Sequence, residues 1–218
     1  MKNILEIDSV QFGWDESLIL SNVYLGSETG RVTGVLGRNG CGKSTLFKLI
    51  FGDISTNHKS VRINGNVLSG NYRNPAELRM LPQFNFVPKY LKIKGLFESF
   101  NLSYSEFCDV FEDFSLSENY RIGQLSGGNI RIVEIYLILM SNTKFCILDE
   151  PFSHLSPKQV GIFLDLIVQE KEKKGIIISD HMYKYVLDLS DDLYLISDGT
   201  SYKIDDANEL VDYRYLNG

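Results

Sequence analysis

Short apolar runs separated by turn-forming residues recur along the chain, and each has the length of a β-strand. The clearest are residues 32–36, 78–81, 145–149 and 176–179. Runs that are apolar at nearly every position are typical of strands buried on both faces of a sheet. Residues 4–8, Ile-Leu-Glu-Ile-Asp, instead alternate apolar and polar side chains, which also predicts a strand.

Helical signals lie between these runs. Residues 44–51 predict a helix that stops at Gly52, and residues 130–140 predict an apolar helix. Ser156 and Pro157 are a typical helix start, with serine as N-cap and proline at the first helical position. That helix is expected to run to about Lys174. Strands alternating with helices predict an α/β fold with a largely parallel sheet.

Two tight hairpins are also expected. Asn64-Gly65 lies between two short apolar segments, and Asp198-Gly199 follows the run that ends near residue 197. Both dipeptides suit a type I′ turn, in which two residues adopt positive φ. The tail from Asp205 to Leu216 is polar, and we expect it to be helical.

The segment from Phe84 to about Ser126 differs from the rest because aromatic residues cluster in it. Phe107, Val110, Phe111 and Phe114 have the spacing of one helix face. Ser103 with Glu106 predicts a capping box before that helix. We interpret the segment as a small helical subdomain and the aromatic residues mostly as its core, in preference to a surface that stacks on bases.

Composition narrows the function classes. The chain has 218 residues, 44% of them hydrophobic, which suits one α/β domain of ordinary size. A net charge of −6 argues against a surface that coats nucleic acid. The longest apolar run, 135–140, is too short for a membrane span, and no secretory signal is evident. The three cysteines Cys41, Cys108 and Cys146 share no metal-ligand spacing, so we expect reduced thiols.

The strongest motif is a phosphate-binding loop with the pattern G-x-x-x-x-G-K-S. It comprises Gly37, Arg38, Asn39, Gly40, Cys41, Gly42, Lys43, Ser44 and Thr45. An apolar strand precedes it and an apolar helix follows it, which is the context that this motif requires. Its glycines let backbone amides approach an anion, and the helix start adds its own amides. Lys43 would reach the β and γ phosphates, and Ser44 would hold Mg²⁺. A reactive thiol at Cys41 is the less favoured alternative to a small residue that the loop needs.

Three further polar features follow apolar strands. They are Gln83, the pair Asp149-Glu150, and His181. Functional groups gather at the carboxyl ends of strands in parallel sheets, so these side chains should share one edge with Lys43. Asp149 can hold Mg²⁺, and Glu150 can orient or deprotonate an attacking water. Gln83 can sense Mg²⁺ and the γ-phosphate, and His181 can contact the γ-phosphate.

Taken in order, these motifs strongly resemble those of the ATP-binding subunit of ABC transporters over nearly the whole chain. Gly37–Thr45 matches Walker A, Gln83 the Q-loop, Phe145–Glu150 Walker B with its glutamate, and His181 the switch histidine. The most specific match is Leu125-Ser126-Gly127-Gly128, the family signature. The resemblance implies a P-loop NTPase core with a mostly parallel sheet, an N-terminal antiparallel β subdomain and a small helical subdomain.

The resemblance also assigns roles that spacing alone does not. Trp14 stands where the family places an aromatic residue that stacks on adenine; a surface-packing role is the alternative. Ser126, Gly127 and Gly128 would face the γ-phosphate held by a second subunit, so two chains would enclose two ATP molecules. Two positions depart from the pattern. Asn129 replaces the usual glutamine, and Ser156 replaces the usual D-loop aspartate, which puts communication between the two ATP sites in doubt.

The resemblance implies one domain over 1–218, with a helical subdomain at about 84–128 inserted between 1–83 and 129–218. It implies an ATPase that uses ATP and Mg²⁺, forms an ATP-dependent homodimer and drives a separate transmembrane permease. Such a subunit would be cytoplasmic and peripheral at the inner face of the cell membrane, without a nucleic-acid partner. The alternatives are an ABC ATPase unconnected with transport and a regulatory subunit that senses ATP with weak hydrolysis.

Overall fold

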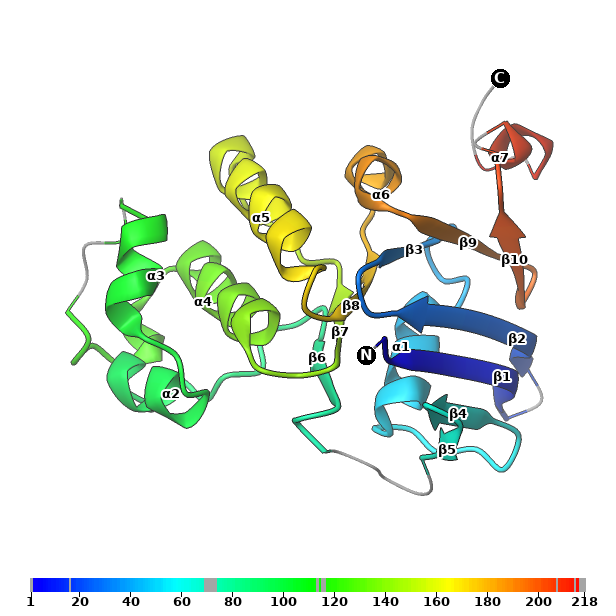
Figure 1. Ribbon diagram of the computed structural model, residues 1–218, viewed down its shortest axis with the longest axis horizontal. Helices are drawn as coiled ribbons and strands as arrows, with labels where there is room; N and C mark the ends of the chain where they lie inside the picture. Colours follow the sequence, from blue (N-terminus) through cyan, green and yellow to red (C-terminus); the bar gives the residue numbers. More distant parts are fainter. Residues whose placement is uncertain are drawn as a thin grey trace.

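The computed structural model describes residues 2–15, 17–68, 74–112, 114, 117–206, 208–213 and 215. Two sheets organise them. The larger has the strand order β10-β9-β3-β8-β7-β6, and the smaller has the order β2-β1-β4-β5. Figure 1 shows the smaller sheet beside α1 at one end of the molecule and the helices α2, α3 and α4 at the other.

The larger sheet holds the strands that the apolar runs predict. Its members are β3 (Val32–Leu36), β6 (Leu78–Leu81), β7 (Phe145–Asp149), β8 (Gly175–Ser179), β9 (Asp192–Ser197) and β10 (Thr200–Ile204). All neighbours pair in parallel except β9 and β10, which form the predicted hairpin. The carboxyl ends of β3, β6, β7 and β8 therefore lie along one edge, where the sequence predicts the functional groups to meet.

The smaller sheet is antiparallel. It consists of β1 (Ile4–Trp14), β2 (Ser17–Glu28), β4 (Ser60–Ile63) and β5 (Asn66–Val67). The expected N-terminal antiparallel sheet is confirmed, and β1 continues through Trp14 rather than stopping before it. Both predicted hairpin turns have positive φ at their central residues, 53° and 78° at Asn64-Gly65 and 50° and 76° at Asp198-Gly199.

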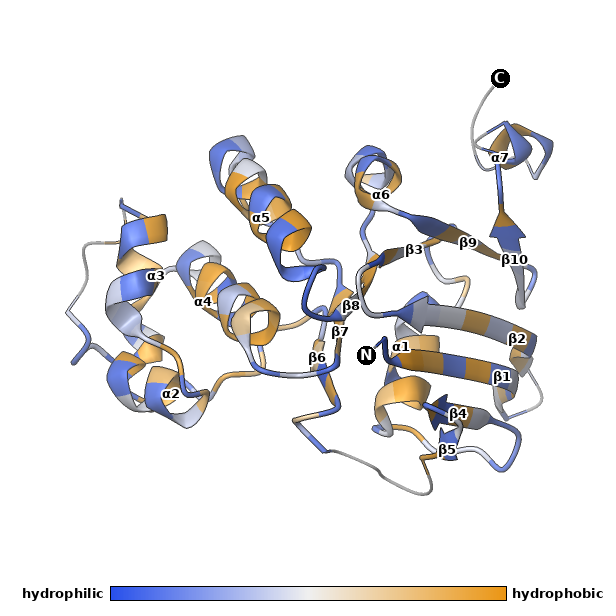
Figure 2. Cartoon of the chain, viewed as in Figure 1, coloured by the Kyte–Doolittle hydropathy of each residue, from blue (hydrophilic) through white to orange (hydrophobic). Residues whose placement is uncertain are grey.

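Helices cover both faces of the larger sheet, and the sheet separates two hydrophobic cores. The helices are α1 (Lys43–Phe51), α2 (Ile93–Ser99), α3 (Tyr104–Val110), α4 (Gly127–Met140), α5 (Pro157–Glu170), α6 (Tyr183–Leu189) and α7 (Glu209–Asp212), with a 3-10 turn at Ile122–Gln124. Alternate residues of the central strands enter different cores: Cys146 and Leu148 pack with the α4 and α5 side, and Ile147 packs with the α1 side. This explains why the strands are apolar throughout (Figure 2).

The predicted helix ends are mostly where local chemistry places them. Gly52 closes α1 at φ 93°, its amide donating to the Lys48 carbonyl. Ser156 caps α5 with a reciprocal box in which Gln159 also takes part. The helix stops at Glu170, four residues before the predicted end, because a tight turn carries the chain into β8: the Lys173 and Lys174 amides both donate to the Glu170 carbonyl.

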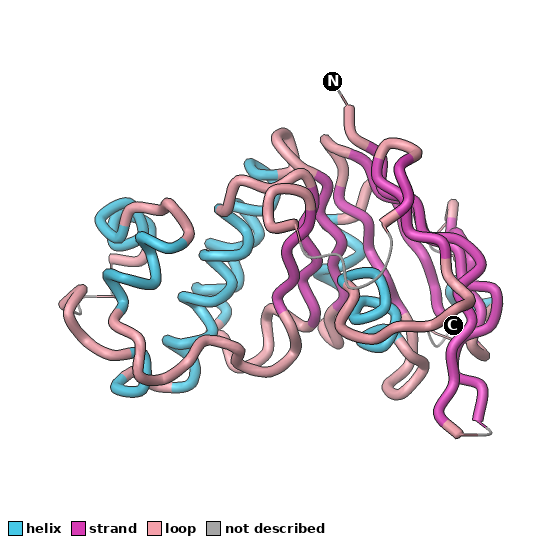
Figure 3. Tube along the Cα trace, turned by 90° about the horizontal axis from the view of Figure 1, so that it is seen from below, coloured by secondary structure: helices cyan, strands magenta, loops and turns pink. Residues whose placement is uncertain are grey.

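The aromatic segment forms a helical subdomain, as predicted, with one correction. Ser103 caps α3, but the helix ends at Val110 and does not continue to Phe114. Phe111 and Phe114 still reach the core, with ring centroids 5.1 and 4.8 Å from that of Phe107, because a turn after the helix folds them back. Figure 3 shows this helical group apart from the strands. The boundaries 84–128 stay a prediction.

Other exceptions concern the surface and the tail. Phe84 and Tyr90 are 76% and 72% exposed, so these two aromatic residues are not core. The tail holds one short helix, α7, in place of a helix across its length, and Leu216 lies outside the described residues. Over the part of the chain that is described, no helix is both long and apolar enough to cross a bilayer.

Candidate functional site

The phosphate loop joins the carboxyl end of β3 to the first turn of α1. Gly42 caps α1 with φ 106°, and a Cβ at this position would lie 2.8 Å from the Leu20 side chain. Both the backbone conformation and the space therefore require glycine. Since glycine carries no side chain to accept the first helical amides, this helix end is left to an external anion.

A cleft of about 570 Å³ opens beside this helix end. It is lined by Ile19, Asn39, Gly40, Gly42, Lys43, Ser44, Thr45, Gln83, Glu150, Ser153 and His181. Lys43 Nζ donates to the carbonyl oxygens of Gly37 at 2.7 Å and Arg38 at 3.2 Å, which holds the ammonium group against the loop. The cleft thus brings together groups that follow β3, β6, β7 and β8.

Asp149 ends β7 beneath the phosphate loop and is 1% exposed. Neither of its carboxylate oxygens has a hydrogen-bond partner. Burial raises its pKa to about 6, while the nearby Ser44 hydroxyl and the Lys43 ammonium act in the opposite direction. A buried carboxylate without partners, next to a serine hydroxyl, fits a hard divalent cation such as Mg²⁺.

The described residues contain no cluster of three or more His, Cys, Asp or Glu side chains that could hold a metal by themselves. The donor set at this place is smaller, namely Ser44, Asp149 and the amide oxygen of Gln83. Mg²⁺ commonly takes few protein ligands and completes its shell with substrate phosphates and water. The residues present therefore fit a cation that arrives with a nucleotide.

Glu150 and Gln83 contact one another across the cleft. The Gln83 side-chain amide donates to Glu150 Oε2 at 2.8 Å. Glu150 has φ 48°, an uncommon conformation for a residue other than glycine, and its amide donates to the Ser179 carbonyl at 2.7 Å. The positive φ turns the chain just after β7, so that Glu150 and Asp149 differ in environment: one lines the cleft, and the other is buried.

His181 follows β8 and reaches the same cleft. Its Nδ1 lies 3.3 Å from the carboxylate of Asp180, and its side chain is half exposed. Asp180 is itself buried and accepts hydrogen bonds from the Phe152 and Met182 amides. The carboxylate is fixed by the backbone, and it can therefore orient the imidazole toward the cleft.

Trp14 does not line the cleft. It ends β1 at the tip of the hairpin, 57% exposed, with its ring at right angles to Phe12 and a centroid distance of 5.0 Å. The neighbouring strand β2 contributes Ile19 to the cleft wall. Trp14 thus has the free face that base stacking needs, and adenine stacking stays a prediction.

Ser126, Gly127 and Gly128 also lie outside the cleft. They begin α4, where the Ser126 hydroxyl accepts the Asn129 amide at 3.2 Å. A Cβ at Gly127 would meet nothing within 4 Å. Within one chain, the signature residues and the phosphate loop therefore do not form a common site.

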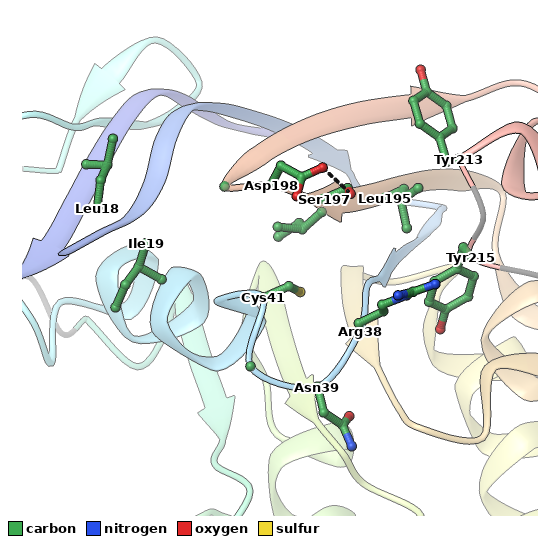
Figure 4. Close-up of a pocket in the computed structure, with 13 residues that line it drawn as sticks. Leu18, Ile19, Arg38, Asn39, Cys41, Leu195, Ser197, Asp198, Tyr213 and Tyr215 are labelled. Atoms are coloured by element: carbon green, nitrogen blue, oxygen red, sulfur yellow. Dashed lines mark hydrogen bonds between the residues drawn. The ribbon is translucent and has the colours of Figure 1, made fainter.

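The opposite side of the phosphate loop faces a second cavity, of about 410 Å³ (Figure 4). Arg38 and Cys41 line it together with Tyr213 and Tyr215 from the tail. Burial raises the pKa of both the Tyr215 hydroxyl and the Cys41 thiol. A raised pKa leaves a thiol protonated and unreactive, which favours the packing role for Cys41. Cys108 and Cys146 are likewise free thiols.

Comparison with known proteins decides the family. The sequence model for ABC transporters matches residues 20–153, more than half of the 218-residue chain. The chain belongs to the ABC transporter family. Its motifs are those of the ATP-binding subunits, and the α/β fold expected from the resemblance is confirmed.

Curated relatives of this ABC protein include both import and export subunits. The galactose/methyl galactoside import ATP-binding protein MglA of Clostridium perfringens is 30% identical over 96% of this chain, which spans 44% of that relative's length. The lipopolysaccharide export system ATP-binding protein LptB of Haemophilus influenzae is 27% identical, over 90% of this chain and 88% of its own. A solved ATP-binding subunit of an ABC transporter shares the fold with a TM-score of 0.80 and 21% identity, covering 99% of this chain and 95% of the other.

The structure of this ABC protein adds residues that the sequence analysis missed. Ile19 lines the cleft, but nothing in its local sequence distinguishes it from other strand residues. Ser153 also lines the cleft, although the family resemblance indicates only that it lies in the D-loop. Arg131 and Glu134 are buried in α4 and contact the backbone around Gln83 and Glu150. A signal for these two did exist, since they are the charged residues of an otherwise apolar helix.

Proposed function

We propose that this ABC subunit binds ATP with Mg²⁺, pairs with a second copy around the nucleotides, hydrolyses ATP and drives a separate transmembrane protein. The observation that carries the proposal is the cleft, which gathers Lys43, Ser44, Gln83, Glu150 and His181 around one helix N-terminus. Cations, backbone amides and a general-base candidate at one place are the parts that phosphoryl transfer to water requires.

Each residue has a role that follows from its position. The amides of Gly40, Gly42 and Lys43 cradle the phosphates, joined by the other loop residues from Gly37 to Thr45. When the nucleotide binds, the Lys43 ammonium group gives up its hydrogen bonds to the loop carbonyls and donates to phosphate oxygens instead. Bound Mg²⁺, held by Ser44 and Asp149 with Gln83 nearby, would neutralise charge that develops on the phosphates.

Glu150 is the proposed catalytic residue for the water. It lines the cleft next to Asp149, accepts a hydrogen bond from Gln83, and can align a water or accept its proton. His181 contributes a donor from the adjacent strand end, oriented by Asp180. Gln83 links the two functions because its amide can bond either to Glu150 or to groups of the nucleotide.

Pairing of two copies completes the site in this proposal. The α4 N-terminus with Ser126, Gly127 and Gly128 does not line the cleft of its own chain but offers amides to an anion. A two-fold arrangement would place each signature against the partner's γ-phosphate. Ser156 caps α5 in place of the usual aspartate, which keeps the helix start and removes a negative charge from this loop.

An apolar groove suits the membrane partner. It has a volume of about 290 Å³ and lies between the end of β6 and the helical subdomain. Its lining includes Leu78, Met80, Phe86, Phe100 and Ile138. A short helix of a transmembrane protein could insert an apolar face there, close to Gln83. The subunit would then be peripheral at the cytoplasmic side, and the membrane partner would determine substrate and direction.

Glu150→Gln tests the proposal. The change keeps size and hydrogen bonding but removes the basic oxygen, so ATP turnover should fall by roughly 10²-fold or more. ATP should still bind, with one negative charge fewer near its phosphates. With hydrolysis blocked, the variant should elute as a dimer in gel filtration with ATP and Mg²⁺, and as a monomer without them.

A matched control is Glu172→Gln, which removes an exposed carboxylate outside the cleft. It should keep normal turnover. Wild-type turnover in Glu150→Gln would refute the catalytic role. An ATP-dependent dimer that forms equally in the unmutated chain would show that hydrolysis does not limit its lifetime.

A further inference from the structure

Two charged side chains are buried in α4, the helix that begins with the signature. Arg131 is 3% exposed and Glu134 is 0% exposed, in a helix whose other buried residues are apolar or aromatic. They are one turn apart, with Arg131 Nη1 3.8 Å from Glu134 Oε2. Burying charge is costly unless hydrogen bonds compensate it, so their contacts need an explanation.

Arg131 donates hydrogen bonds to the backbone carbonyls of four residues. Nη1 donates to the Pro82 oxygen at 2.8 Å, and Nη2 donates to the Asp149 and Glu150 oxygens at 3.0 and 2.8 Å. Nε donates to the Pro151 oxygen at 3.4 Å. One guanidinium group therefore holds the residue before Gln83 and three consecutive residues around the strained backbone of Glu150.

Glu134 continues this pattern on the other side of Gln83. Its Oε1 accepts the amides of Phe86 and Val87 at 2.7 and 2.9 Å. The segment that carries Gln83 is thus held from α4 both before and after the glutamine. Gln83 donates a hydrogen bond to Glu150 across the cleft, and the backbone near each of these two residues is bonded to side chains of the same helix, α4.

We infer that Arg131 and Glu134 are positioning residues for hydrolysis, which fix the backbone of Glu150 and of the Gln83 segment to the signature helix. The inference rests on the proposed function, because it concerns the water-aligning role of Glu150. It has a mechanical consequence. Any shift of α4 when its N-terminus engages a phosphate moves the support of Glu150 with it, so signature contact and water alignment are coupled within one chain.

The test is Arg131→Lys, which keeps the positive charge but replaces the planar fork with a single ammonium group. One ammonium group cannot reach four carbonyls in the geometry of the guanidinium. We expect kcat to fall by about tenfold, since small displacements of a catalytic group are costly, with the ATP dissociation constant changed less than about twofold. Glu134→Gln keeps an acceptor for the two amides and should retain most of the activity, whereas Glu134→Leu should lose it as Arg131→Lys does.

Lys174→Gln is the matched control, since Lys174 is also buried and also bonds backbone carbonyls of this region. Its Nζ donates to the Leu139 and Ser141 oxygens at 2.6 and 2.7 Å, at the far end of α4. This control should lower the melting temperature and leave kcat unchanged. The inference would be overturned if Arg131→Lys and Lys174→Gln both lost kcat in proportion to their loss of stability. A normal kcat in Arg131→Lys would overturn it as well.

A second readout separates this inference from the proposed function. Hydrogen exchange at the Phe86 and Val87 amides should speed up in Glu134→Leu and not in Lys174→Gln, whether or not the protein hydrolyses ATP. Absence of turnover in the unmutated chain would contradict the proposed function. Unchanged amide protection in Glu134→Leu would contradict the positioning role itself.

Discussion

Two helices of this protein begin at functional motifs, and their N-termini are built differently. The start of α1 is capped by Gly42, which has no side chain, and it opens into a cleft beside Lys43 and Ser44. The start of α4 is capped by Ser126, whose hydroxyl already accepts an amide of its own helix. The cleft beside the phosphate loop is not lined by Ser126, Gly127 or Gly128.

The difference teaches how one backbone property can serve two purposes. Both helix ends present amides and the positive end of a helix dipole. The α1 end is completed by the Lys43 ammonium group of its own chain, which favours an anion, and the buried Asp149 carboxylate can hold a metal cation that accompanies the anion. At the α4 end, the Ser126 hydroxyl already accepts one amide of the helix, and the other amides of the first turn gain a partner only when another molecule supplies an anion. This asymmetry supports binding at one end and closure of a dimer at the other.

The largest expected effect concerns Asp149, the buried carboxylate beside the start of α1. Burial raises the pKa of Asp149 to about 6, against 3.8 in a model compound. At neutral pH the metal-free folded protein therefore holds an unfavourable buried charge. Asp149→Asn should raise the free energy of unfolding by up to about 3 kcal/mol in a magnesium-free buffer at pH 7.5.

The same prediction fixes a pH window. Below about pH 6 the native Asp149 takes up a proton while the unfolded chain does not, so the wild-type protein gains stability as pH falls toward 4. The difference between the two proteins should shrink over this interval. Urea unfolding of both proteins at several pH values measures it. A difference that is constant with pH would show that Asp149 has an ordinary pKa.

The next effect concerns Lys43, the cation of the α1 end. Lys43→Ala removes a charge-assisted contact to the phosphates, and ATP affinity should fall by roughly tenfold or more. Titration calorimetry measures the affinity directly. Lys48→Ala is the matched control, because it removes a cation from the last turn of the same helix, outside the cleft. Equal affinities for Lys43→Ala and the unmutated chain would remove the main support for ATP at this helix end.

The smallest effect on the single chain is expected at the α4 end. Gly127→Ala adds a Cβ with nothing within 4 Å, so the isolated protein should be unchanged or more stable by up to about 1 kcal/mol. The same methyl group would stand where a partner's phosphate is proposed to approach. ATP affinity should stay normal while ATP-dependent dimerisation and turnover decrease. Undiminished dimerisation in this variant would argue that the signature glycines do not face a second copy.

The sequence predicts this fold well where local chemistry decides it. The phosphate loop, the four buried strands around it and the cap at Ser156 all follow from residues that are close together in the chain. The early end of α3 does not, because Phe111 and Phe114 reach their core through a turn whose spacing imitates a helix. The charge of Arg131 in an apolar helix marks the residue in the sequence, but its partners cannot be predicted, since they are backbone carbonyls, which every residue possesses, 18 to 49 positions away.

The contacts of Lys43 change how nucleotide binding should be regarded. Its ammonium group already donates to two loop carbonyls, at 2.7 and 3.2 Å, and these contacts compete with phosphate oxygens for the same protons. Association with ATP is then an exchange of partners, not an addition of contacts. The measured enthalpy should be smaller than a count of phosphate hydrogen bonds suggests, and analogues without a γ-phosphate should leave part of the lysine's original bonding intact.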